Sequence, residues 1–107
     1  MTNMSAQEYE RARLFFAMKD YSTAARILAE VVETAPESVA ARLLLARAYY
    51  HSAQLTRAEA ELRRVLEQDP VESYAHLMLG RTLERQSRDE EAARHLRLAE
   101  AMGAGQV

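Results

Sequence analysis

The feature that most constrains this chain is a sequence that repeats every 34 residues. The stretch YSTAARILAEVVETAP, residues 21–36, returns as LTRAEAELRRVLEQDP at residues 55–70 and as DEEAARHLRLAEAMGA at residues 89–104. Alanine and leucine keep their places in all three copies: Ala24, Ala58 and Ala92, then Leu28, Leu62 and Leu96. A fixed period of this size is typical of a solenoid, in which each unit buries its apolar face by stacking on a neighbour.

Each copy is preceded by a second segment that keeps the same period. A small residue recurs there and a bulky one follows three residues later: Ala12, Ala46 and Gly80, then Phe15, Tyr49 and Leu83. Segments such as VAARLLLARAYYHS have apolar residues at helical spacing and no glycine, so we expect both halves of each unit to be helices. Residues 5–38, 39–72 and 73–106 are therefore expected to be three helix-turn-helix units of one domain, residues 1–107.

The ends of these helices have sequence signals of their own. The patterns SAQE at Ser5 and TRAE at Thr56 are typical of caps at helix N-termini, and Pro36 and Pro70 stop the second helix of their units. The sequence thus predicts an all-α fold of six antiparallel helices in three pairs, with breaks near residues 19–20, 36, 53–54, 70 and 87–88.

Composition narrows the class of protein. The chain has 107 residues, a net charge of −2, 49% hydrophobic residues and no cysteine, which fits one compact unit without disulfides or cysteine-bound metal. No apolar run approaches the roughly 20 residues that cross a bilayer, and the N-terminal segment lacks the apolar core of a signal peptide. We expect a cytoplasmic protein, and the use of thirteen arginines against one lysine suggests a bacterial genome rich in GC.

These small, bulky and terminating residues together resemble the tetratricopeptide repeat (TPR) family, from Ser5 to Gln106. The fourth position of each unit departs from the family pattern, because Glu8, Arg42 and His76 stand where tryptophan is usual. The resemblance implies a short right-handed α-solenoid whose first helices line a concave groove for peptides or partner proteins. The lysines and asparagines of the family's clamp for C-terminal carboxylates are absent.

The groove residues expected from this resemblance combine arginines with aromatic and apolar side chains. They come from the second, fifth, ninth and twelfth positions of each first helix, which share one side at helical spacing. The predicted partner-binding residues are Tyr9, Arg13, Phe16, Leu43, Arg47, Tyr50, Tyr74, Leu77 and Arg81. Guanidinium groups match carboxylates, and aromatic faces supply rigid apolar area, so we expect a protein partner with an acidic segment and apolar anchors.

A different interpretation of the same residues stays open. Each arginine could pair with an acidic residue of its own surface, and the tyrosines could be ordinary packing. Stacking three like charges contributes little to stability, which favours binding of a partner.

Residues in the first and last units predict how the two ends of the solenoid meet solvent. Arg11 and Glu100 replace apolar residues of the other units and are interpreted as polar caps, so three repeats are expected to be the whole protein. Leu98 and Met102 instead replace polar residues of the earlier units and lie one turn apart. An exposed apolar pair of this kind suggests a weak homodimer through the last helix, which is the alternative function.

Signals for other functions are poor. His51, His76 and His95 fall at different repeat positions and are expected to point in different directions, so no shared metal site is predicted. There is no glycine-rich phosphate loop and no pattern for a nucleophile with its base, so neither an enzyme nor a cofactor is expected. The acidic total makes nucleic acid and membrane surfaces minor options as partners.

Overall fold

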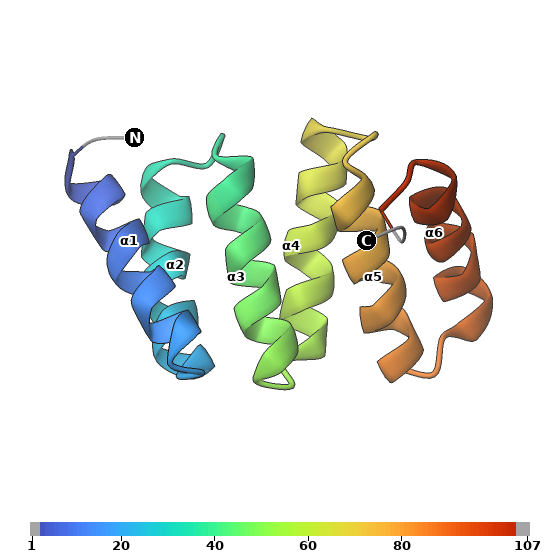
Figure 1. The fold of residues 1–107 in the computed structure, drawn as a ribbon, viewed down its shortest axis with the longest axis horizontal. Coiled ribbons are helices and arrows are strands. Elements are labelled where there is room, and N and C mark those ends of the chain that lie inside the picture. The colour runs from blue at the N-terminus through green and yellow to red at the C-terminus, as the bar shows by residue number, and fades with distance from the viewer. Residues whose placement is uncertain (1–2, 105–107) are drawn as a thin grey trace.

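A computed structural model describes residues 3–104, and this part of the chain contains six α-helices. They are α1 (Asn3–Ala17), α2 (Tyr21–Thr34), α3 (Val39–His51), α4 (Leu55–Gln68), α5 (Ser73–Arg85) and α6 (Asp89–Ala101). Successive helices are antiparallel and stand in a row from the N-terminus to the C-terminus (Figure 1). The predicted all-α fold of six antiparallel helices in sequential pairs is confirmed. Among the described residues, no helix has both the length and the apolar character needed to cross a membrane.

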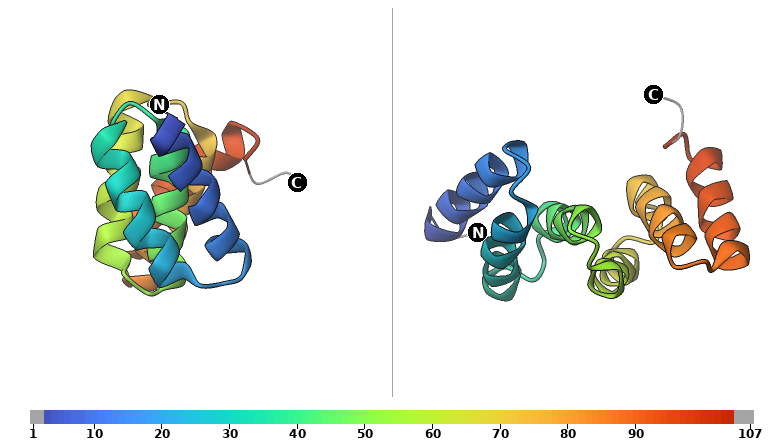
Figure 2. Two further views of the ribbon diagram at one scale, coloured as in Figure 1. Left: turned by 90° about the vertical axis from the view of Figure 1, so that its left-hand side faces the viewer. Right: turned by 90° about the horizontal axis from the view of Figure 1, so that it is seen from below.

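The row of helices is curved. It is 40 Å long and 24 Å across in each other direction. Seen from below, the helices follow a shallow arc, with α1, α3 and α5 toward its inside and α2 and α4 toward its outside (Figure 2). We call the side formed by α1, α3 and α5 the inner face; it points toward the viewer in Figure 1. The predicted groove residues belong to these three helices.

The tight turns inside the units share one backbone conformation. Lys19, Ala53 and Ser87 follow the first helix of their units and have φ angles of 64°, 61° and 61°. In each turn the next residue donates its N–H to a carbonyl five residues earlier, as Asp20 does to Phe15 at 2.9 Å. This is the Schellman pattern, which reverses the chain and satisfies carbonyls at the helix end. The three turns fall at the breaks that the sequence predicts.

The N-terminal caps differ from the sequence prediction. Ser5 and Thr56 lie inside α1 and α4, so the prediction that they cap these helices is wrong. Side chains cap three other helices: Asp20 accepts from the N–H of Thr23 at α2, Ser38 from that of Ala41 at α3 at 3.2 Å, and Glu72 from that of Tyr74 at α5 at 2.7 Å. At α4 the reason is that the helix already begins at Leu55, directly after the turn at Ala53 and Gln54.

The core is built where the repeat keeps its small residues. Ala24 and Ala58 are fully buried, and Ala92 is almost so, because the second helix of each unit approaches the first at these alanines. One core cluster lies between α1, α2 and α3 and a second continues through α3 to α6. Gly80 allows a close approach of α6 to α5, since a Cβ atom there would lie 2.5 Å from Cδ2 of Leu96.

Candidate functional site

Arg47, at the middle of the inner face, joins all three units. Its guanidinium lies over the ring of Phe16 on α1, 4.8 Å from the ring centroid, and over the ring of Tyr74 on α5 at 5.8 Å. Both distances are within the range of cation–π attraction. The side chain is half-buried, and within residues 3–104 it forms no ion pair with a carboxylate. The two aromatic rings thus hold the guanidinium group in place and leave its positive charge available to an anion.

Arg85 adds a second cation that the sequence prediction missed. It ends α5 and reaches back to the second unit, where its guanidinium lies 4.6 Å from the ring centroid of Tyr50. One of its N–H groups donates to the backbone carbonyl of Tyr50 at 2.9 Å. Across the described part of the chain, Arg85, like Arg47, has no carboxylate partner.

His51 lies near both arginines and is surrounded by aromatic rings. Its imidazole stacks on Tyr21 at 4.6 Å between centroids and meets Tyr50 edge to face at 5.5 Å. Burial lowers the pKa of His51, and the charges of Arg47 and Arg85 lower it further. A proton on this ring is therefore disfavoured by two neighbouring cations, which is the electrostatic signature of a place that attracts an anion.

The other two arginines of the predicted set are neutralised on their own helices. Arg13 forms an ion pair with Glu10 at 3.2 Å, and Arg81 forms one with Glu84 at 3.0 Å. Both are exposed, so these pairs contribute little to stability. The alternative interpretation of the arginines, as paired surface charges, fits these two, whereas Arg47 is different.

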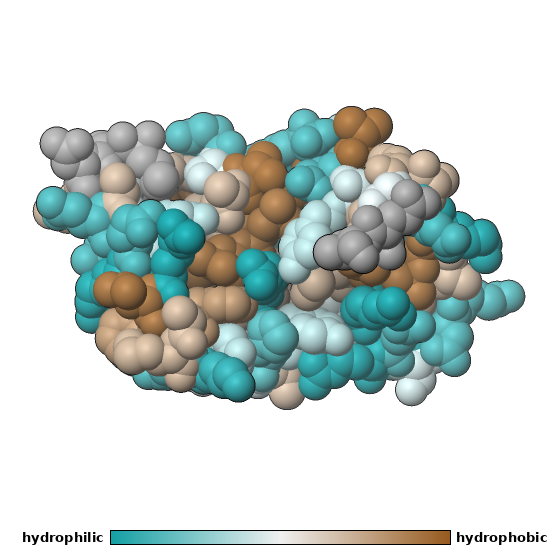
Figure 3. Space-filling model, viewed as in Figure 1, coloured by the Kyte–Doolittle hydropathy of each residue, from teal (hydrophilic) through white to brown (hydrophobic). Residues whose placement is uncertain are grey.

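The apolar members of the predicted set are half-buried. Tyr9 and Phe16 are half-buried against the first core cluster, and Leu43, Tyr50 and Tyr74 against the second. Leu77 is half-buried on α5. Hydrophobic surface gathers over α3 in the middle of the inner face, with hydrophilic residues around it (Figure 3). The face thus offers apolar area directly beside Arg47 and Arg85, which have no carboxylate partner among residues 3–104.

The residues predicted for self-association lie on the surface of α6 and at its C-cap. Leu98 is 47% exposed and Met102 is 37% exposed, so both are accessible. Glu100 and Arg11, the predicted polar caps, are also exposed. Homodimer formation through this helix stays a prediction.

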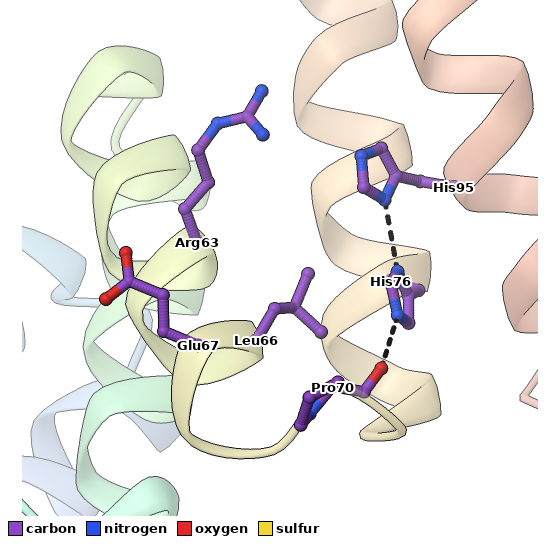
Figure 4. A pocket seen from close by; sticks show the side chains of 6 residues that line it. All are labelled: Arg63, Leu66, Glu67, Pro70, His76 and His95. Carbon is purple, nitrogen blue, oxygen red and sulfur yellow. Dashed lines mark hydrogen bonds between the residues drawn. The ribbon is translucent and has the colours of Figure 1, made fainter.

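Two histidines meet away from the inner face, and here the sequence prediction is wrong. Nδ1 of His76 lies 3.0 Å from Nδ1 of His95, although these residues were expected to point in different directions. The reason is that α5 and α6 are antiparallel, so different repeat positions face each other within one unit. The two rings line a cavity of about 430 Å³ with Arg63, Leu66, Glu67 and Pro70 (Figure 4). Among the described residues, no three His, Cys, Asp or Glu side chains form a group that could bind a metal ion.

Solved structures with this arrangement include proteins of several kinds. A MamA chain from Desulfovibrio magneticus RS-1 has 27% identity and a TM-score of 0.88, over 97% of this chain and 59% of its own. YrrB, described as a TPR protein with an unusual peptide-binding site, has 22% identity and a TM-score of 0.90, over 99% and 54%. The second TPR of Spaghetti (RPAP3), bound to the HSP90 peptide SRMEEVD, has 17% identity and a TM-score of 0.87, over 94% and 93%.

These similarities differ in what they establish. The matches to YrrB and Spaghetti, at identities below 25%, show the fold alone, and the chain spans less than two thirds of the MamA and YrrB chains. No curated protein matches the sequence significantly. The family model for the tetratricopeptide repeat matches residues 15–82, which is more than half of the sequence. Together with the repeats and the six-helix fold, this match shows that the chain belongs to the tetratricopeptide repeat family.

Proposed function

We propose that the inner face binds an acidic segment of a partner protein and that Arg47 anchors it. The observation that carries this proposal is the position of the Arg47 guanidinium between the rings of Phe16 and Tyr74, without a carboxylate partner among the described residues. A cation held in this way is already ordered, so it has little side-chain freedom left to lose when a ligand binds. Its hydrogen-bond donors are matched to a carboxylate.

The surroundings of Arg47 define the rest of the proposed ligand. Arg85 supplies a second positive charge, and His51 lies near both. The half-buried rings of Tyr50 and Tyr74 and the side chain of Leu43 provide apolar area for a hydrophobic residue of the same segment. The proposed ligand is therefore a short peptide segment in which Asp or Glu lies next to an apolar side chain. Peptide binding by YrrB and by the Spaghetti domain is consistent with such a role.

The proposal can be tested without knowing the partner. A library of random peptides is selected against the wild-type protein and against Arg47→Gln. We expect the wild type to select peptides rich in Asp and Glu beside apolar residues, with roughly micromolar affinity that weakens with added salt. Loss of one charged hydrogen-bonding partner is expected to weaken the selected peptides roughly tenfold or more.

A matched control separates the effect of losing Arg47 from the effect of lowering the protein's total positive charge. Arg94→Gln removes the same charge from an exposed position on α6 and is expected to leave the affinity almost unchanged. The proposal fails if Arg47→Gln and wild type bind the selected peptides equally well, or if Arg94→Gln weakens them as much as Arg47→Gln does.

A second candidate function is weak self-association through α6. It is favoured by the exposure of Leu98 and Met102 at positions that are polar in the other units. Light scattering over a concentration series compares wild type with the Leu98→Glu/Met102→Glu variant, and with Val71→Glu as a control at another exposed apolar residue. We expect the wild type to associate and only the Leu98→Glu/Met102→Glu variant to lose this association. A wild type that stays monomeric at high concentration would contradict self-association through α6.

Within the same proposal, the protein is a non-catalytic adaptor or chaperone-like scaffold. No enzyme is named among the similar structures described above. The cytoplasmic location expected from the sequence stays a proposal.

A further inference from the structure

We infer that His76 and His95 form a proton-sensitive clasp that holds α6 against α5. The two Nδ1 atoms are 3.0 Å apart, and the ring planes differ by 23°. The ring centroids are 5.3 Å apart, which is close to the largest separation that rings with nitrogens at this distance can have. The nitrogens therefore point at each other. This is the geometry of one N–H···N hydrogen bond between the helices.

The neighbouring backbone fixes where the protons lie. Nε2 of His76 is 2.9 Å from the carbonyl oxygen of Pro70, which can only accept, so this nitrogen must donate. A neutral His76 then has no hydrogen on Nδ1 and accepts there. Consequently His95 must donate from its own Nδ1, which leaves its Nε2 without a hydrogen on the side of the cavity (Figure 4).

The second unit has a different pair of residues in the same place. Arg42 and Glu61 precede His76 and His95 by 34 residues each, and they join α3 to α4 by an ion pair at 2.6 Å. Arg42 also donates to the carbonyl of Pro36, as His76 does to that of Pro70. An arginine and a glutamate keep their charges throughout the range in which histidine titrates. Among residues 3–104, the contact between His76 and His95 is therefore the joint within a unit that protons in this range can change.

Proton addition affects the clasp in two stages. A first proton enters at Nε2 of His95 and leaves the hydrogen bond to His76 in place, because Nδ1 of His95 still donates. A second proton must go to Nδ1 of His76, the remaining acceptor. Both Nδ1 atoms then carry hydrogens and both rings are cations, so the hydrogen bond is lost and replaced by repulsion.

The charges around the clasp also oppose its protonation. Burial lowers the pKa of His95, and His76, Arg63 on α4 and Arg94 on α6 lower it further, while Glu91 on α6 raises it. Glu67 of α4 is a further acidic residue that lines the cavity. Because the folded-state pKa of His95 lies below the unfolded value, its stabilising contribution is present above about pH 6.5. It is lost as the pH falls from there toward the folded-state pKa.

The consequence is confined to one end of the molecule. In a solenoid each unit contacts only its neighbours, so a weakened joint opens its own unit without unfolding the others. We therefore expect α6 to open from α5 in mild acid while the first two units stay folded.

Amide hydrogen exchange between about pH 7.5 and pH 5, corrected for the intrinsic effect of pH, tests the clasp. In wild type we expect protection in α6 to fall by roughly tenfold for each unit by which the pKa of His95 is lower in the closed state than in the open state. The His76→Arg/His95→Glu variant carries the pair of the second unit and is expected to lose this pH dependence. His51→Gln removes a histidine from the inner face and is expected to keep it.

Two results would overturn the clasp: α6 protection that does not change with pH in wild type, or the same fall in the His76→Arg/His95→Glu variant. Nitrogen NMR of the imidazoles in wild type gives a further test that needs no variant. At about pH 7.5, where neutral histidine dominates, we expect hydrogens on Nε2 of His76 and on Nδ1 of His95. A hydrogen on Nε2 of His95 with none on its Nδ1 would contradict the assignment.

Discussion

Arg42 and His76 make the same contact one repeat apart: each donates to the carbonyl oxygen of the proline six residues before it, at 3.0 Å and 2.9 Å. Each also reaches across to the second helix of its own unit, Arg42 to Glu61 and His76 to His95. In the second and third units the fourth repeat position, which lacks the tryptophan usual in the family, is thus a polar joint. It ties the loop between units to both helices of the unit that follows.

The first prediction concerns the joint in the second unit. Arg42 has a side chain only 4% exposed, whereas that of Glu61 is 19% exposed. Arg42→Met leaves the carboxylate of Glu61 without its partner, whereas the carbonyl of Pro36 keeps the side-chain amide of Gln68 as a donor at 3.1 Å. We expect a loss of about 2–3 kcal/mol in the free energy of unfolding, below the usual cost of breaking a fully buried pair because Glu61 retains access to water.

The matched variant for this joint replaces both partners. Arg42→Met with Glu61→Leu removes the charges together and is expected to recover most of the loss, since apolar residues of similar size often replace such pairs without penalty. Urea unfolding of wild type and the single and double variants provides the measurement. A double variant no more stable than Arg42→Met would contradict this account.

The second prediction uses the left-handed turns. Ala53 has a φ of 61°, a conformation that is unfavourable for a residue with a Cβ atom and free for glycine. Ala53→Gly is expected to raise the free energy of unfolding by about 1 kcal/mol. The control is Ala60→Gly in the exposed interior of α4, where glycine is expected to lower it by about 1 kcal/mol. Urea midpoints that move in the same direction for both variants would refute the role of the turn.

Sequence reasoning predicted the fold because the determining residues repeat. The buried alanines, the leucines beside them and the two prolines recur with one period, and each pattern supports the same helix pair. Helix starts were less predictable. Ser5 and Thr56 match a local capping pattern, yet the Schellman turn at Ala53 makes Gln54 the N-cap of α4 and carries Thr56 into the helix.

The candidate site was only partly predictable, for reasons that are specific to each arginine. Arg13 and Arg81 each have a glutamate three residues away on the same helix, while Leu44 and Tyr50 occupy the corresponding places beside Arg47. That difference is present in the sequence and marks Arg47 as the unpaired one. Arg85 lies outside the predicted stripe and reaches the face only because its long side chain returns to the carbonyl of Tyr50. The contact between His76 and His95 depends on how two helices align, which no local pattern reports.

The third prediction tests the close approach at Gly80. A Cβ atom at this position would meet Leu96 at 2.5 Å and the carbonyl oxygen of Ala92 at 3.3 Å. Gly80→Ala is therefore expected to lower the free energy of unfolding by about 1–2 kcal/mol, as overpacking exceeds the gain in helix propensity. In a Leu96→Ala background the clash with Leu96 is gone and only the 3.3 Å contact with the carbonyl oxygen of Ala92 remains, so the same substitution is expected to stabilise by up to about 1 kcal/mol. Thermal unfolding of the four proteins checks this reversal of sign, and additive effects would disprove it.

The last prediction concerns the electrostatics of the proposed binding site, for which the pKa of His51 is the measured quantity. Its pKa is lowered first by burial and then by Arg47 and Arg85. In the free protein, Arg47→Gln/Arg85→Gln is expected to raise the pKa of His51 toward the usual value near 6.5 without reaching it, because burial remains. An acidic peptide bound to wild type is expected to raise it as well, since a carboxylate stabilises the protonated ring. NMR titration of the ring protons measures both effects, and Arg94→Gln should produce neither. If the double substitution leaves the pKa of His51 where it is, the three groups do not form one electrostatic site; if only the peptide has no effect, the site exists but the acidic segment binds elsewhere.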